Sequence, residues 1–176
     1  MIYVECHDDF LKKNIISLLR QKKFSTMNEY SNKFFFKLKI YQEEKFLFCL
    51  IKDDKIKFTL PNKFNEMFDK IYDFVSNKNI YINNFYYYPF KQLIKGNEKT
   101  SLLSEIQNNI LIYLLLNLDN GIGKIELMQN IWPKDKDIFL NKLDTHLTNL
   151  KNQIYNDLNY EIKFSSKSGI LKLSIN

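Results

Sequence analysis

Apolar residues recur at helical spacing between residues 138 and 158. Leu143, Leu147, Leu150 and Ile154 follow one another at steps of four, three and four, which places them in one narrow stripe along an α-helix. The opposite face of this helix carries small and amide side chains, namely Asn141, Thr145, Thr148, Asn149 and Asn152. The pattern predicts a helix that is buried on its leucine side and offers hydrogen-bond donors and acceptors on the other.

The flanking residues predict the elements that would hold this helix. Short apolar runs between turn residues predict an antiparallel meander with strands at 80–82, 85–90, 92–94 and 99–102. Ser104 and Gln107 have the spacing of a capping box, which would begin an apolar helix over 105–118. The remaining elements expected are a helix over 124–132 that ends at Pro133, a loop at 134–137, and a hairpin of strands 160–164 and 170–174 around a polar tip.

The first part of the chain predicts a separate α/β unit. Strands are expected at 2–6, 34–41, 45–51 and 56–60, with a loop at 25–33 and tight turns at 42–44 and 53–54. Asp8 or Asp9 is expected to cap a helix after the first strand, and a second helix is expected over 62–75. The polar stretch 76–79 is the candidate linker, so the predicted domains are 1–77 and 78–176.

Composition and charge permit nucleic-acid binding without pointing to it. The net charge of +6 is spread evenly, because residues 1–77 carry 14 basic and 11 acidic side chains and residues 78–176 carry 12 and 9. The chain has no alanine and a single arginine, Arg20, and its wealth of Lys, Asn, Ile, Phe and Tyr suggests an AT-rich genome. No apolar run of roughly 18 residues and no signal-peptide pattern occurs, and Cys6 and Cys49 lack metal-ligand spacing. We therefore expect a cytoplasmic protein with reduced thiols.

The C-terminal half resembles a known family. Residues 127–132 (LMQNIW) and 143–151 (LDTHLTNLK) are similar to the pattern of that family, which consists of two leucines, a tryptophan, a loop and V-D-x-H-I-x-R-L-R. Leu103-Ser104 with Gln107 resembles the leucine, threonine and glutamate that open the family's first helix. The family is the OmpR/PhoB-type response regulators, and the resemblance covers about 80–173. It implies an α+β winged helix-turn-helix domain that binds DNA.

The N-terminal half resembles a shortened receiver domain of the same family. Residues 2–5 with the helix after them are similar to its first strand and helix, and residues 60–75 are similar to its last strand and helix. Cys6 and His7 stand near the acidic pair that binds magnesium, and Leu60 replaces the switch lysine. Asp53 and Asp54 fit a turn better than a phosphoacceptor site, because the carboxylates that magnesium chemistry needs are absent. The fold expected is thus a degenerate α/β receiver-like unit, independent of phosphorylation, before the winged helix.

The winged-helix interpretation places helix 138–158 in the major groove of duplex DNA, where side chains read base edges and phosphate contacts set the register. Asn149 and Asn152 match adenine, and Thr145 suits a thymine methyl group. The resemblance places arginines at Asn149 and Lys151, and the loss of the first favours A·T-rich targets over guanine. The full set of candidate DNA-binding residues is Trp132, Asn141, Lys142, Thr145, His146, Thr148, Asn149, Lys151, Asn152, Lys163 and Lys167.

Several of these residues have a plain alternative role. The asparagines are also expected on a solvent-exposed helix face of an Asn-rich protein that has no binding role. His146 is either a phosphate contact, as the resemblance implies, or a structural residue beside the leucine stripe. The indole N–H of Trp132 either reaches a phosphate or the ring fills the core, and both can hold. In a wing, Lys167 would contact the minor groove of DNA. Lysine is less suited to this contact than arginine.

Other chemistry has little support in the sequence. Tyr86-Tyr87-Tyr88, with Phe85 and Phe90, is better explained by the alternating faces of a strand than by a base-stacking platform. The two histidines are isolated, and neither a Gly-rich phosphate loop nor a metal-ligand cluster occurs, so we expect no enzyme, no cofactor and no metal.

The sequence therefore predicts a transcription regulator that binds double-stranded DNA. The resemblance implies a homodimer through residues 1–77 and a contact between loop 133–137 and RNA polymerase, with no membrane association. The rival hypothesis is a protein-interaction module, that is, a winged helix that has lost DNA binding. The weak charge and the missing arginines favour the rival.

Overall fold

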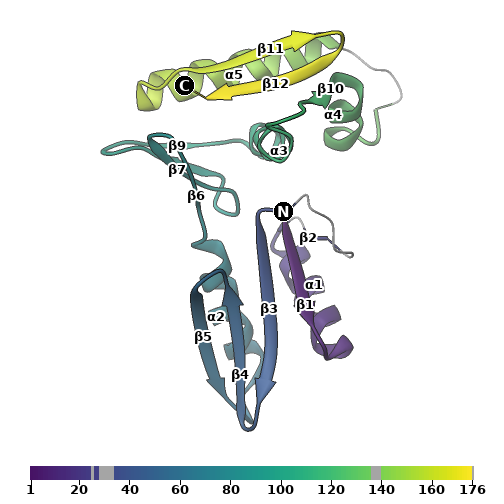
Figure 1. Ribbon diagram of the computed structural model, residues 1–176, viewed down its shortest axis with the longest axis vertical. Helices are drawn as coiled ribbons and strands as arrows, with labels where there is room; N and C mark the ends of the chain where they lie inside the picture. Colours follow the sequence, from purple (N-terminus) through teal and green to yellow (C-terminus); the bar gives the residue numbers. More distant parts are fainter. Residues whose placement is uncertain (25, 28–33, 136–139, 176) are drawn as a thin grey trace. The chain divides into compact units, whose positions relative to one another are not determined.

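A computed structural model describes residues 1–24, 26–27, 34–135 and 140–175. The chain forms two compact units, Met1–Lys78 and Asn79–Asn176, each with its own sheet and helices (Figure 1). Most of the predicted loop 25–33, the end of the predicted loop 134–137 and the first two residues of the predicted helix 138–158 lie outside the described residues.

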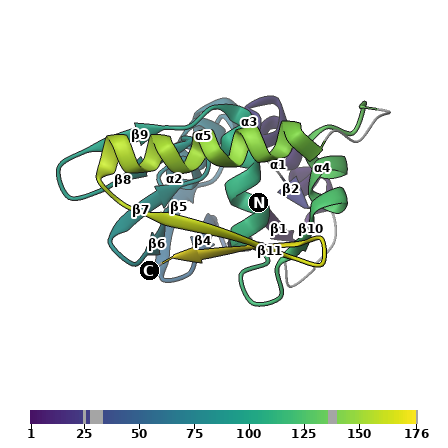
Figure 2. The same ribbon diagram turned by 90° about the horizontal axis from the view of Figure 1, so that it is seen from above.

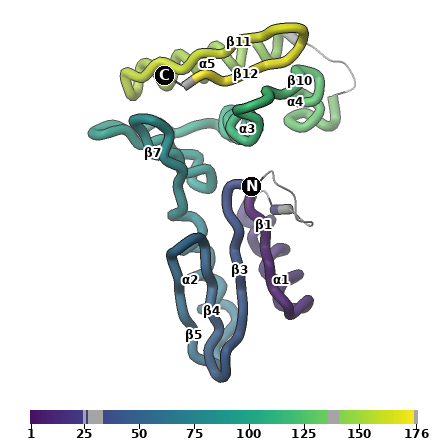
Figure 3. Tube along the Cα trace, in the orientation of Figure 1, coloured from purple at the N-terminus to yellow at the C-terminus, as the bar shows by residue number. Residues whose placement is uncertain are grey.

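The first unit is a five-stranded sheet with two helices. Its elements, in chain order, are β1 (Ile2–Cys6), α1 (Asp9–Gln21), β2 (Thr26–Met27), β3 (Phe36–Glu43), β4 (Phe46–Ile51), β5 (Asp54–Thr59) and α2 (Phe64–Ser76). The strand order is β2-β1-β3-β4-β5. Strand β1 runs parallel to both of its neighbours, whereas β3, β4 and β5 form an antiparallel meander that Figure 3 traces as one continuous path.

One face of this sheet is the core of the first unit. The strand register aligns its apolar side chains, and those that are fully or almost fully buried are Ile2, Val4, Phe36, Leu38, Ile40, Leu47, Cys49, Ile51 and Phe58. Helices α1 and α2 lie on the same side of the sheet in Figure 1, and Phe24, just after α1, stacks on Tyr72 of α2 with ring centroids 5.3 Å apart. The helices add Ile15, Leu19, Met67, Phe68, Ile71 and Val75 to the buried layer.

Most local predictions for this unit hold with small shifts, but residues 26–27 of the predicted loop form strand β2, and Asp54 of the predicted turn begins β5. Asp8 caps α1 by accepting a hydrogen bond from the backbone N–H of Leu11 at 2.8 Å. The predicted turn at 42–44 is wrong by two residues, because β3 extends through Glu43, and Glu44 takes the positive φ of the turn. The second helix begins at Phe64 instead of Asn62, with Lys63 as its N-cap residue.

The position of Asp53 and Asp54 bears on the receiver-like interpretation. Because β1 is parallel and β4 antiparallel to β3, the β4–β5 turn lies toward the amino end of β1, and Cys6 lies at the carboxyl end of that strand. Asp54 forms an ion pair with Lys78. Neither aspartate lies beside the carboxyl end of β1, where an acidic metal site would need it, and the receiver-like interpretation stays a prediction.

The second unit contains a meander, three helices and a hairpin. The meander is β6 (Ile80–Ile82), β7 (Phe85–Tyr88), β8 (Leu93–Lys95) and β9 (Thr100–Leu102). The rest, in chain order, is α3 (Glu105–Leu115), β10 (Ile122–Gly123), α4 (Lys124–Ile131), α5 (Leu140–Leu158), β11 (Ile162–Lys167) and β12 (Ile170–Ile175). Figure 2 shows α5 and the β11–β12 hairpin side by side.

Several predictions for this unit differ from the structure. Helix α3 ends at Leu115, three residues before the predicted end. The strands of the hairpin pair from Ile162–Ile175 to Lys167–Ile170, so its tip is only Ser168-Gly169 and the predicted polar tip 165–169 is mostly strand. The two-residue strand β10, which pairs with β12, was not predicted, because two residues are too few to show a periodic pattern.

A polar network fastens α5 to the meander and to α3. Ser104 and Gln107 form the predicted capping box. The Gln107 amide donates to Gln153 at 2.8 Å, and Gln153 donates to the carbonyl oxygen of Leu102 at 2.7 Å. The Ser101 hydroxyl donates to Asp157 at 2.6 Å. The amide groups on this flank of α5 are thus occupied, and they fix which face of the helix remains exposed.

Candidate nucleic-acid interface

The front of α5 is the exposed face opposite its leucine stripe. Leu143, Leu147, Leu150 and Ile154 are at most 5% exposed, as predicted. The residues exposed on the front are Asn141, Thr145, Thr148, Asn149 and Asn152. The threonine hydroxyls donate to helix carbonyl oxygens four residues earlier, at 2.8 Å for Thr145 and 2.9 Å for Thr148. This bonding leaves their methyl groups as the outward contact atoms, with the asparagine amides as the outward hydrogen-bonding groups.

A groove of about 890 Å³ separates α5 from the hairpin. It is lined by Thr148, Lys151, Asn152 and Lys163 of the predicted set, together with side chains that the sequence analysis did not single out. Two of these are carboxylates, Asp144 and Glu161. The groove therefore joins part of the α5 front to the base of the wing.

The carboxylates pair with the lysines of this groove. Lys124 Nζ lies 2.9 Å from Asp144 Oδ1. Glu161 is shared, since one of its oxygens is 3.8 Å from Lys151 Nζ and the other is 3.9 Å from Lys163 Nζ. Lys151 and Lys163, which were predicted to bind DNA, are thus partly neutralised, and this reduces the positive potential of the surface.

Trp132 and His146 form a cluster beside the first turns of α5. Their ring centroids are 5.4 Å apart, and Lys142 Nζ lies 4.4 Å from the centre of the Trp132 ring. Lys142 also pairs with Asp135 at 2.7 Å. The contacts give Trp132 and His146 a structural role in joining the end of α4 to α5, and both side chains remain partly exposed.

The surroundings of His146 lower its pKa. Burial is the larger cause, and the positive charge of Lys142 adds to it. The folded protein therefore holds the neutral imidazole near pH 7, where it can take part in hydrogen bonds but carries no positive charge.

This shift predicts a pH dependence of stability. A depressed histidine pKa means that the unfolded chain binds more protons, so stability is lost as the pH falls through the ordinary histidine range of about 6.5. We expect the denaturant midpoint of the wild-type protein, followed by the fluorescence of its single tryptophan, to fall more between pH 7.5 and 5.5 than that of His146→Gln. Equal losses in the two proteins would contradict the assignment.

The structure divides most of the predicted residues among three places in the second unit. The α5 front holds five of them, the groove adds Lys151 and Lys163, and the cluster holds Trp132, Lys142 and His146. Lys167 is the last residue of β11, next to the tip of the hairpin. Of the predicted loop 133–137, residues 133–135 are exposed and the last two residues lie outside the described part of the chain.

Lys124, Asp144 and Glu161 of the groove are not among the residues predicted from the sequence. Asp144 belongs to the stretch that resembles the family, but its ion pair with Lys124 spans 20 residues and depends on how α4 meets α5. Tyr155 was also missed, although it is 54% exposed and lies one helical turn after Lys151. Its large exposed ring on a helix otherwise covered by polar groups is a signal that the sequence did contain.

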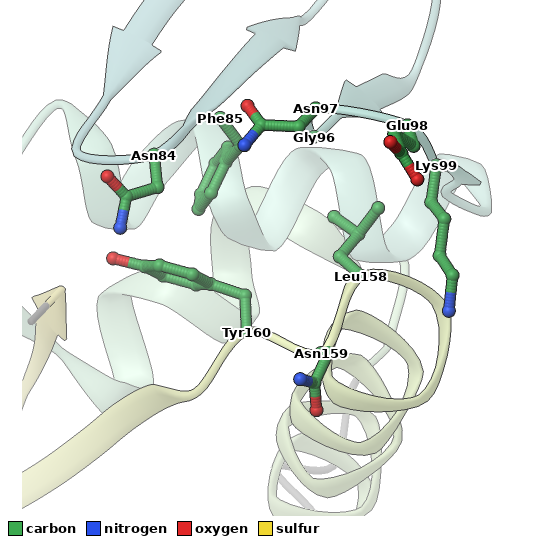
Figure 4. A pocket seen from close by; sticks show the side chains of 9 residues that line it. All are labelled: Asn84, Phe85, Gly96, Asn97, Glu98, Lys99, Leu158, Asn159 and Tyr160. Atoms are coloured by element: carbon green, nitrogen blue, oxygen red, sulfur yellow. The ribbon is translucent and has the colours of Figure 1, made fainter.

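A second hollow, of about 450 Å³, lies at the far end of α5 (Figure 4). Phe85 and Tyr160 face each other across it with ring centroids 5.1 Å apart, and Leu158 and the turn around Gly96 close its side. The lining includes one carboxylate, Glu98, and one ammonium group, Lys99. The edge-to-face rings pack the end of α5 against the meander.

Among the described residues, no group of three or more His, Cys, Asp or Glu side chains is placed to hold a metal ion. None of the helices in the described ranges is both long enough and apolar enough to cross a membrane.

The second unit has the element order of a winged helix-turn-helix. Helices α3, α4 and α5 pack together, and the β10-β12-β11 sheet supplies the wing. No family model matches the sequence, and no curated protein matches it.

Three solved structures are similar to the chain. The DNA-binding domain of Escherichia coli CadC is 14% identical, with a TM-score of 0.49 over 57% of this chain and 95% of that one. The C-terminal domain of the nisin resistance regulator NsrR, a lantibiotic response regulator, is 26% identical, with a TM-score of 0.38 over 47% and 84%. A mutant of RitR is 10% identical, with a TM-score of 0.43 over 99% and 65%.

Proposed function

We propose that the protein is a DNA-binding transcription regulator whose second unit reads duplex DNA with the front of α5. The observation that carries the proposal is the exposed row of threonine methyl and asparagine amide groups on a helix whose opposite face is buried. A helix fits the major groove, and a rigid helix presents its side chains to base edges in a fixed register. The hairpin beside α5 is the proposed minor-groove contact.

The chemistry of the α5 front favours A·T base pairs. A carboxamide matches the N6 and N7 atoms of adenine in a bidentate pair, and a threonine methyl group packs on the methyl group of thymine. Guanine reading by a bidentate arginine has no counterpart on this surface, because the only arginine is Arg20 in the first unit. We therefore propose A·T-rich sites.

The proposal is tested by fluorescence anisotropy of the full chain on A·T-rich duplexes, with scrambled competitor DNA and a series of salt concentrations. A sequence-specific protein stays bound to the A·T-rich duplex when scrambled DNA is added. Its affinity for the duplex falls steeply with salt, because phosphate contacts release counterions. Absence of binding to every duplex at low salt would contradict the proposal.

Replacement of Glu161 is expected to strengthen DNA binding. In Glu161→Gln the negative charge that Lys151 and Lys163 share is removed, so both ammonium groups become available to phosphates and a repulsion is lost. We expect DNA binding to tighten by about 0.5–1 kcal/mol, roughly two- to fivefold, at low salt and less at high salt. Glu98→Gln, which changes the charge equally at the far end of α5, is the control. Equal tightening in both variants would show that only the net charge matters.

Regulation is proposed to be independent of phosphorylation, because Asp53 in the β4–β5 turn and Asp54 at the start of β5 lie away from the carboxyl end of β1. Pairing of two chains through residues 1–77 and a contact between loop 133–137 and RNA polymerase are proposals that rest on the family resemblance. Sedimentation of the full chain at micromolar concentration, with and without DNA, tests the first, and a monomer in both conditions would contradict it.

The ion pairs of the groove favour a second candidate, a winged helix that docks a protein. Asp144 and Glu161 lower the positive potential where a phosphate backbone would lie. The salt dependence separates the candidates, because docking of a protein partner releases few counterions.

A further inference from the structure

The first unit has a second sheet face that its helices do not cover. The strand register places alternate residues of β1, β3, β4 and β5 on this face, opposite the buried core. Its members are Tyr3, Glu5, Lys37, Lys39, Tyr41, Glu43, Phe46, Phe48, Leu50, Lys55, Lys57 and Thr59. We call the part formed by Lys39, Tyr41, Phe46, Phe48, Lys55 and Lys57 the lysine–aromatic face.

Lysine ammonium groups lie over the rings of this face. Lys57 Nζ is 3.5 Å from the centre of the Phe46 ring, and Lys55 Nζ is 3.7 Å from that of Phe48. Lys39 and Lys55 each approach the Tyr41 ring at 5.5 Å. Phe48 is only 7% exposed although no helix of the described unit covers this side, because lysine stems and neighbouring rings shield it.

The surroundings of these three ammonium groups are largely free of acidic groups in the part of the chain that the structure describes. Among the residues that the structure describes, no carboxylate lies within ion-pair distance of Lys39, Lys55 or Lys57. Glu5, at the edge of the face, is held by Lys37 at 2.5 Å, and that hydrogen bond together with the charges of Lys37 and Lys39 lowers the Glu5 pKa. The lysine–aromatic face is thus a positive surface whose three lysines are exposed.

We propose that the lysine–aromatic face binds the phosphate backbone of nucleic acid. Adjacent strands lie about 4.8 Å apart and alternate residues along a strand about 6.8 Å apart, so the sheet presents charges in a regular array that suits a repeating polyanion. The ring contacts restrict the lysine side chains, so less rotamer entropy is lost when a phosphate binds. The site lies in the other unit from α5 and is independent of base reading.

The test uses the full chain with Lys39→Gln, Lys55→Gln and Lys57→Gln combined. Anisotropy is measured over a salt series on a mixed-sequence duplex and on a thymidine single strand. Each lost phosphate contact reduces the slope of log affinity against log salt by about 0.9 on a duplex and about 0.7 on a single strand. We expect the duplex slope to fall by about 2–3 and the affinity to fall equally for all sequences.

Two matched variants control for fold and net charge. Lys39→Arg, Lys55→Arg and Lys57→Arg combined keep the charge and are expected to keep the slope. Lys13→Gln, Lys63→Gln and Lys70→Gln combined remove three exposed lysines outside this face and are expected to leave the slope nearly unchanged. Circular dichroism of each variant verifies that the sheet is intact.

The outcomes separate this inference from the proposed function. Loss of slope in the lysine variant, with no effect of replacing Asn149 and Asn152, would support the face and contradict α5 as the reader of bases. A wild-type slope in the folded lysine variant would overturn the inference. So would tight binding of polyglutamate to the wild-type chain without binding of either nucleic acid, because the partner would then be an acidic protein.

Discussion

Leu150→Ala is expected to lower the free energy of unfolding of the second unit by about 2–5 kcal/mol. Leu150 is fully buried in the stripe that joins α5 to the core, so its truncation loses transfer free energy and leaves a cavity. The measurement is urea unfolding of the full chain followed by tryptophan fluorescence. Trp132 is the only tryptophan and lies in the second unit, so the signal reports that unit alone.

Asn156→Ala is the control for this prediction. Asn156 is an exposed residue of the same helix, and alanine has the higher helix propensity, so its replacement is expected to change stability by at most about 0.5 kcal/mol. If Leu150→Ala cost no more than Asn156→Ala, the leucine stripe would not be what holds α5 in place.

Asn149→Ala combined with Asn152→Ala is expected to remove most discrimination between an A·T-rich site and scrambled DNA. Each bidentate amide–adenine pair contributes about 1–3 kcal/mol of discrimination, so the double variant loses about 2–6 kcal/mol if both pairs form. Both side chains are exposed, and we expect folding to be unchanged. The salt slope stays as in the wild type, because no phosphate contact is lost.

Competition anisotropy with labelled specific duplex and unlabelled scrambled duplex measures this loss. Asn65→Ala is the control, since Asn65 is an exposed asparagine on α2 of the first unit. A double variant that still prefers the specific duplex as strongly as the wild type would rule out the α5 front as the base-reading surface. Loss of salt slope in the same variant would indicate instead that the amides contact the phosphate backbone.

Local sequence patterns were sufficient for the α5 front. The four-three-four spacing of its leucines and isoleucine determines which side of the helix faces the core. The amides lie on the opposite side and are exposed, regardless of which elements pack against the leucines. The capping box at Ser104 and the alternation of Tyr86, Tyr87 and Tyr88 are likewise local, since each depends on residues within one turn or one strand.

The electrostatic character of the groove was not predictable in this way. Glu161 follows Lys151 by ten residues, and its approach to both Lys151 and Lys163 depends on the path of the chain between α5 and β11. A count of charges along the sequence assigns the lysines to phosphate contacts. The fold instead places a carboxylate between them.

The lysine–aromatic face shows the same limit in the first unit. Alternation within β3, β4 and β5 predicts that each strand has a polar side. The sequence shows the lysines of β5, but it does not show which side chains of the neighbouring strands lie beside them. Only the antiparallel register sets Phe48 between Tyr41 and Lys57 and brings Lys55 over a ring of the neighbouring strand.

The sequence by itself determined the longer elements of this protein and the buried side of its long helix, because periodic burial and capping act over a few neighbouring residues. The tertiary structure decided the strand directions of the first unit, the ion pairs of the groove and the positive sheet face. These features depend on contacts between segments that are remote in the chain, and their energies arise only when the backbone brings the segments together.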